Sequence, residues 1–208
     1  MATMALRLLI YDRTCRGAGL RPGLSHAWRA GSWLYRGLGR FDAARAASCW
    51  DEALAWLAAL DTAQRIAEIQ YWGHGKWGCA RIADDVLDRS ALQPGHPLRA
   101  RLVAVRERLA PDALWWFRTC ETFGATAGHD FARAWTDFFG APAAGHTYII
   151  GYYQSGLHRL APGCAPHWAD DEGLERGTAA EPEQALWSER HAPNTITCLQ
   201  GHLPDPTW

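Results

Sequence analysis

Short apolar runs alternate along the chain with segments of helical periodicity. Residues 6–11 form a nearly continuous apolar run that ends at Asp12, which is typical of a strand buried on both faces. We predict a second strand at residues 66–72, which ends at Gly73-His74-Gly75, a third at residues 114–117 and a fourth at residues 147–153. The pattern therefore predicts four central strands that are separated by longer segments.

The segments between these runs carry helical spacing. Trp50, Leu54 and Leu57 fall on one face within residues 42–60, and similar faces run through residues 98–109 and 126–139. Strands that alternate with helices predict an α/β fold, a three-layer sandwich in which helices cover both faces of a mostly parallel sheet.

The end of the chain has a different character. From residue 161 onward it is rich in Pro and Gly and has an acidic stretch at residues 170–172. We interpret residues 1–160 as the α/β domain and residues 161–208 as an irregular C-terminal extension packed on it. Within the extension we expect a helix near residues 181–190 and a short strand at residues 195–199.

Composition and charge exclude several classes of function. Hydrophobic residues make up 48% of the chain and the net charge is −1, so the chain can bury a core but lacks the basic stripe that nucleic acid requires. No apolar run reaches the ~18 residues of a membrane span, and the first residues do not resemble a signal peptide. We expect a cytoplasmic protein whose six cysteines are reduced. No glycine-rich phosphate loop is present, and we expect no cofactor.

A histidine and a cysteine follow two of the predicted strands. His74 comes just past residues 66–72, between Gly73 and Gly75, and Cys120 comes just past residues 114–117. The carboxyl ends of parallel strands meet at one edge of a sheet, where ligands bind, so we expect the two side chains to lie close together. An imidazole can take the proton of a thiol and turn it into a nucleophile.

The segments around these two residues resemble a known family. Residues 71–75 read Tyr-Trp-Gly-His-Gly, residues 115–121 read Trp-Trp-Phe-Arg-Thr-Cys-Glu, and Cys120 follows His74 by 46 residues. The pair resembles caspase-like (clan CD) cysteine peptidases, in which the offset is about 50 residues, and among them the bacterial caspase-like domains related to the CHAT group. The likeness covers roughly residues 5–160.

The resemblance implies a caspase-like fold and a cysteine endopeptidase that works through an acyl-enzyme. It implies Cys120 as the nucleophile, His74 as general base and acid, and the backbone amides of Gly75 and Cys120 as oxyanion donors. Glu121 departs from the family pattern, which has a small or polar residue followed by Gly at this point, and a carboxylate there raises the pKa of the nucleophile. The alternative is a catalytically inactive caspase-like domain that binds a peptide or protein.

Candidate substrate contacts follow the first and fourth predicted strands. Asp12 suits a basic substrate side chain, Arg13 or Arg16 suits an acidic one, and a solvated loop charge is the alternative for each. Tyr153 and Ser155, with Gln154 between them, are expected to form a groove edge, or else an ordinary end of a strand. The expected partners are a protein or peptide substrate and a regulatory protein.

A second group of residues has the chemistry of metal ligands. Cys164, His167, Cys198 and His202 have plausible short spacings for zinc, and a zinc-braced interaction domain is a third hypothesis. Their order matches no zinc finger pattern, and scattered polar loop residues are the alternative. We therefore predict no metal site.

Overall fold

A six-stranded sheet forms the centre of the protein. The computed structural model describes residues 5–18, 21–61 and 63–204. The strand order is β12-β10-β9-β5-β1-β4, and all neighbours run parallel except β10 and β12. The strands are β1 (Leu6–Asp12), β4 (Ala43–Ala47), β5 (Ile66–Trp72), β9 (Leu109–Arg118), β10 (Ala143–His146) and β12 (Leu157–Leu160). The predicted α/β fold with a mostly parallel sheet is confirmed.

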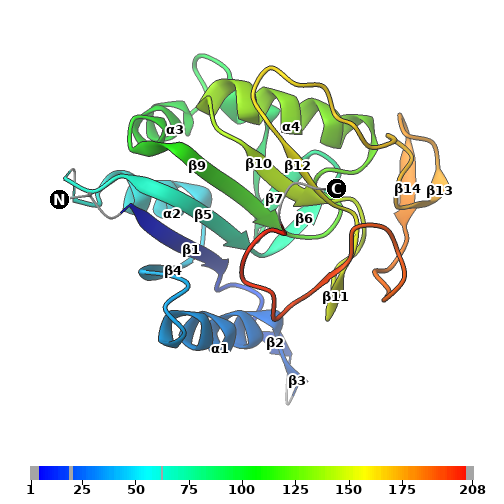
Figure 1. The fold of residues 1–208 in the computed structure, drawn as a ribbon, viewed down its shortest axis with the longest axis horizontal. Coiled ribbons are helices and arrows are strands. Elements are labelled where there is room, and N and C mark those ends of the chain that lie inside the picture. Colours follow the sequence, from blue (N-terminus) through cyan, green and yellow to red (C-terminus); the bar gives the residue numbers. More distant parts are fainter. Residues whose placement is uncertain (1–4, 19–20, 62, 205–208) are drawn as a thin grey trace.

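Helices cover both faces of this sheet (Figure 1). They are α1 (Leu24–Gly37), α2 (Trp50–Ala58), α3 (Arg99–Arg106) and α4 (Ala125–Phe139), with a short 3₁₀ helix at Arg89–Leu92. Because side chains alternate along a strand, Leu8 and Ile10 of β1 join the core beneath α2, α3 and α4, whereas Leu9 and Tyr11 pack with α1 on the opposite face. None of the described helices combines the length and the apolar character that crossing a membrane requires.

The remaining strands form small sheets at the periphery. One has three strands, β6 (His74–Lys76), β7 (Cys79–Ile82) and β8 (Asp85–Asp88). The two-stranded ones pair β2 (Gly17–Ala18) with β3 (Arg21–Pro22), β11 (Tyr153–Gln154) with β15 (Ile196–Thr197), and β13 (Leu174–Gly177) with β14 (Pro182–Ala185).

The C-terminal segment, residues 194–204, lies on the same face of the sheet as α1, where the Tyr35 hydroxyl donates to the carbonyl oxygen of Cys198 at 2.6 Å. Figure 1 shows it in red, running past the tips of the central strands. Ile196 packs with Trp116 of β9 in a small apolar cluster. The Arg118 guanidinium donates to the carbonyl oxygens of Thr197 and Cys198 at 3.1 and 3.0 Å. These contacts attach the end of the chain to the sheet edge where His74 and Cys120 emerge.

Several elements differ from their predicted form. Residues 43–47 of the expected helix at 42–60 form β4, because their main chain pairs with β1 at the edge of the sheet. The fourth central strand is β10, which ends at His146, so most of residues 147–153 is loop. The prediction of a helix near residues 181–190 is wrong, because Pro182–Ala185 forms a strand that pairs with β13.

Candidate active site

His74 and Cys120 leave the sheet side by side. β5 and β9 are neighbours, and Trp72 at the end of one pairs with Arg118 at the end of the other. Each candidate residue stands two positions beyond its strand end. Both line one cavity of about 510 Å³. The structure therefore places both residues at the same edge of the sheet and in the wall of the same cavity.

The loop that carries His74 lies directly against the loop that carries Cys120. A Cβ atom on Gly75 would stand 2.6 Å from the carbonyl oxygen of Cys120 and 2.3 Å from the hydroxyl oxygen of Thr122, so only glycine allows this approach. The amide of Gly78 donates to the carbonyl oxygen of Thr122 at 3.1 Å, and the Thr122 hydroxyl donates to that of Cys79 at 3.2 Å. These hydrogen bonds fix the two loops to each other.

The thiol of Cys120 is partly buried. The amide of Ile150 donates to its sulfur at 3.4 Å. Burial raises the pKa of Cys120, the hydrogen bond from Ile150 lowers it, and the charge of Glu121 raises it further. The net shift is upward, so the resting group is a neutral thiol at neutral pH.

Glu121 has an unusual environment for a carboxylate. Its φ of 55° lies in the left-handed region, which costs a non-glycine residue about 1–3 kcal/mol. Burial raises the pKa of Glu121, while the charge of Lys76 lowers it. Among the described residues its Oε2 atom has no hydrogen-bond partner. The residue that departs from the family pattern is thus a strained and largely buried carboxylate beside the thiol.

His74 is exposed at the mouth of the cavity. Its ring contacts that of Trp28 edge-on, with centroids 5.5 Å apart, and its main chain, at the start of β6, pairs with Arg81 of β7. Within the described residues no hydrogen bond joins the imidazole to the thiol of Cys120. Catalytic hydrogen bonds commonly form only when substrate is bound, and an exposed side chain is free to change rotamer.

Apolar side chains form most of the remaining cavity wall, and the sequence patterns did not point to them. They come from α1 (Leu24, Ala27, Trp28, Leu34), from the loop after β10 (Ile150, Tyr152) and from the C-terminal segment (Leu199). These three segments are far apart in sequence, so only the tertiary structure brings them together. The exposed apolar face of α1 is the one signal that could have found part of this wall.

The candidates at the end of β1 and just beyond it do not line this cavity. Asp12 is fully buried, and its Oδ1 atom accepts hydrogen bonds from the amide and hydroxyl of Thr14 at 2.6 Å. Arg13 forms an ion pair with Glu52 at 3.3 Å and, with Arg16, lines a separate depression. The structure therefore does not bring Asp12 or Arg13 to the thiol.

Tyr153 and Ser155 do not line the cavity within the described chain, whereas the intervening Gln154 does. Tyr153 pairs with Thr197 as β11 meets β15. Ser155 is fully buried, and its hydroxyl donates to the carbonyl oxygen of Glu189 at 3.2 Å. These two residues hold the C-terminal segment in place.

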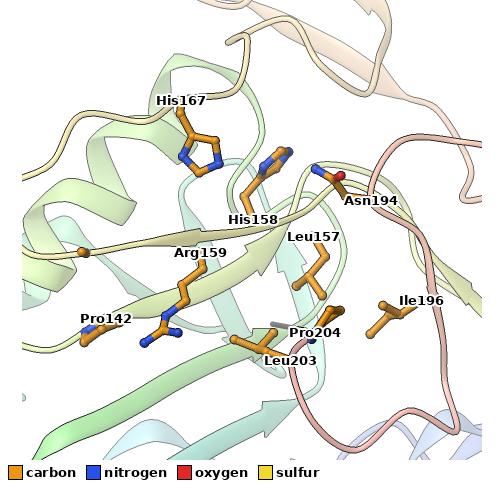
Figure 2. A pocket seen from close by; sticks show the side chains of 10 residues that line it. Pro142, Leu157, His158, Arg159, His167, Asn194, Ile196, Leu203 and Pro204 are labelled. Carbon is orange, nitrogen blue, oxygen red and sulfur yellow. The ribbon is translucent and has the colours of Figure 1, made fainter. Parts of the chain in front are cut away.

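The zinc candidates are separated in the structure. Cys198 lines the cavity of Cys120, whereas His167 lines another cavity of about 390 Å³. Figure 2 shows His158 and His167 side by side at that second cavity, where Nε2 of His158 donates a 2.6 Å hydrogen bond to a carboxylate oxygen of Glu172. Within residues 5–18, 21–61 and 63–204, no group of three His, Cys, Asp or Glu side chains is arranged to hold a metal ion.

Comparison with protein-family models, with curated proteins and with solved structures finds no match to this chain.

Proposed function

We propose that this chain is a caspase-like cysteine endopeptidase that uses Cys120 and His74. One observation carries the proposal. Two adjacent parallel strands end in register, and each delivers one residue of a thiol and imidazole pair into the same cavity. Ligands of open α/β sheets bind at this edge, and this pair of side chains is suited to nucleophilic attack on a carbonyl.

The proposed reaction has two stages. His74 takes the proton of Cys120 as the sulfur bonds to the carbonyl carbon of a peptide, and the carbonyl oxygen becomes an oxyanion. His74 then gives the proton to the leaving amine as the C–N bond breaks, which leaves an acyl-enzyme. Water, deprotonated by His74, attacks this thioester and releases the acid and the free thiol. The backbone amides of Gly75 and Cys120 are the proposed oxyanion donors.

The environment of the thiol indicates when the proton moves. Because burial and Glu121 raise the pKa of Cys120, a stable thiolate and imidazolium pair is not expected at rest. The proton transfer to His74 is expected to accompany substrate binding, when the exposed imidazole turns towards the sulfur. The amide of Ile150, 3.4 Å from the sulfur, stabilises the thiolate that forms.

Cleavage of a set of fluorogenic peptide amides tests the proposal. Cys120→Ala and His74→Ala are each expected to abolish turnover, and Cys164→Ala is the matched control because Cys164 is an exposed thiol elsewhere on the surface. If the wild type cleaves peptides and Cys120→Ala cleaves them equally well, the proposal is wrong.

A second candidate function is a peptide-binding domain without catalysis. The observation that favours it is Glu121, since its charge opposes a thiolate at Cys120. This function predicts that the wild type binds peptides in the cavity but releases them uncut. Incubation of bound peptide with the wild type, followed by mass analysis of the peptide, separates the two functions.

A further inference from the structure

The cavity beside Cys120 has an unusually apolar and open wall. Four large apolar side chains around it are half exposed: Leu24 at 50%, Leu34 at 51%, Tyr152 at 57% and Leu199 at 55%. A single exposed leucine needs no explanation, but several around one opening form a patch that marks a binding site. The side chains come from α1 on one side and from the loop after β10 and the C-terminal segment on the other.

This apolar wall reaches the proposed reacting groups. Trp28 touches the imidazole of His74 edge-on, and the amide of Ile150 contacts the sulfur of Cys120. A Cβ atom on Gly31 would stand 2.9 Å from the ring of Trp72, so α1 lies close over the end of β5. A substrate side chain next to the bond under attack would therefore lie between aromatic and aliphatic surfaces.

Among the described residues that line the cavity, Arg118 is the permanently charged one, and its guanidinium is largely occupied by other contacts. Arg118 is 4% exposed, and its Nε atom donates to the side-chain oxygen of Gln154 at 2.6 Å. Its Nη2 atom donates to carbonyl oxygens of the C-terminal segment, and its guanidinium lies over the rings of Trp72 and Trp116. Only Nη1 has no partner among the described residues. Arg118 thus holds the C-terminal segment and presents little of its charge to a ligand.

We infer that the cavity is a specificity pocket for a large apolar side chain of the substrate, aromatic side chains above all, next to the bond that is cut. Cleavage next to the bound side chain rests on the proposed function, whereas the preference for binding an apolar side chain depends on the cavity alone. An apolar pocket takes the place of the recognition of a charged substrate side chain by Asp12 or Arg13 that the sequence predicted. An acidic residue, read by the free Nη1 of Arg118, is the competing specificity.

The test compares matched peptides with Phe, Leu, Ala, Asp or Arg at the position before the cut. Binding to full-length Cys120→Ala protein is measured by tryptophan fluorescence, because Trp28 and Trp72 line the cavity, and cleavage is measured with the wild type. The Phe peptide is expected to bind about a hundredfold more tightly than the Ala peptide, and more tightly than the Asp and Arg peptides.

Two leucines near the end of α1 provide a matched pair of variants. Leu34 lines the cavity, whereas Leu38, 59% exposed, does not. Leu34→Gln is expected to weaken binding of the Phe peptide about tenfold and to leave the Ala peptide nearly unchanged. Leu38→Gln is expected to leave both unchanged. Thermal unfolding of each variant checks that the fold is kept.

The outcomes separate the inference from the proposed function. Preferred binding of the Phe peptide without cleavage supports the pocket and overturns the peptidase. Cleavage with a preference for Asp or Arg supports the peptidase and overturns the apolar pocket. An equal effect of Leu34→Gln and Leu38→Gln on binding of the Phe peptide also overturns the apolar pocket. If no peptide is bound or cleaved, or if the patch is covered by a second copy in solution, the pocket is refuted.

Discussion

Gly75→Ala is the perturbation that bears most closely on the geometry of the site. The new Cβ atom would stand 2.6 Å from the carbonyl oxygen of Cys120, 2.3 Å from the hydroxyl oxygen of Thr122 and 2.8 Å from the Cβ atom of Thr119. Comfortable contacts between carbon atoms begin near 3.5 Å. The loop that carries His74 must therefore move away from the loop that carries Cys120 by about 1 Å.

This displacement has two consequences of different size. Overpacking of a buried contact costs roughly 1–3 kcal/mol of stability. A misplacement of about 1 Å between reacting groups lowers a rate by about a hundredfold. We therefore expect Gly75→Ala to remain folded with a lower melting temperature, and to lose about a hundredfold in kcat/KM on the best peptide substrate.

Gly37→Ala is the control for a glycine-to-alanine change that creates no close contact. Gly37 is the last residue of α1, and a Cβ atom there would meet no atom within 4 Å. Alanine in place of a helical glycine stabilises by up to about 1 kcal/mol, and activity should be unchanged. The two readouts are denaturation and peptide cleavage. Wild-type activity in a folded Gly75→Ala protein would refute the view that the contact between the two loops positions His74.

Three further variants test other parts of the structure. Glu121→Gln removes a charge that raises the pKa of Cys120, so the midpoint of the pH dependence of Cys120 alkylation by iodoacetamide should move to lower pH, while the exposed Glu183→Gln leaves it in place. Burial lowers the pKa of His146 to about 3, so between pH 6.5 and 3 this histidine binds a proton in the unfolded chain but not in the folded one. The free energy of unfolding should therefore fall by on the order of 4 kcal/mol as the pH drops from about 6.5 towards 3. Urea titrations at several pH values measure this fall, and His146→Gln should flatten it. Arg108, 8% exposed, donates to the carbonyl oxygens of Leu60 and Gln64 at 2.6 and 3.1 Å. Arg108→Met should lower the free energy of unfolding by about 3 kcal/mol and leave kcat/KM unchanged. A loss of activity without a loss of stability would contradict this structural role of Arg108.

The buried strands were predictable because their patterns are strong. Residues 66–72 form β5 with the predicted bounds, and the run that begins at Leu6 forms β1. β1 is a nearly continuous apolar run, β5 is mainly apolar apart from Glu68 and Gln70, and both end in polar or glycine-rich loops. Since these two kinds of signal locate the ends of parallel strands, the position of His74 relative to its strand followed from the sequence.

The elements that were missed depend on distant parts of the chain. Residues 43–47 are four alanines and one arginine, a composition that favours a helix, and they become a strand by pairing with β1. α1 carries exposed Leu24, Trp33 and Leu34, so its apolar face does not mark a buried stripe. The walls of the cavity arise from α1, the loop after β10 and the C-terminal segment, and no local pattern specifies that these three meet.

The most direct test of the central claim is to identify which cysteine a peptide-based reagent modifies. The chain has six free cysteines, of which Cys164 is exposed and Cys120 partly buried. Peptidyl chloromethyl ketones with varied last residues are incubated with the wild type and with His74→Ala, and the modified residue is found by peptide mass mapping. Iodoacetamide reports the intrinsic reactivity of each thiol, which depends on its exposure and its pKa.

We predict that the peptidyl reagents modify Cys120 in preference to Cys164, and that His74→Ala slows this reaction without slowing the reaction of Cys164 with iodoacetamide. Modification in the order of exposure, with Cys164 first and with no effect of His74→Ala at Cys120, would contradict it.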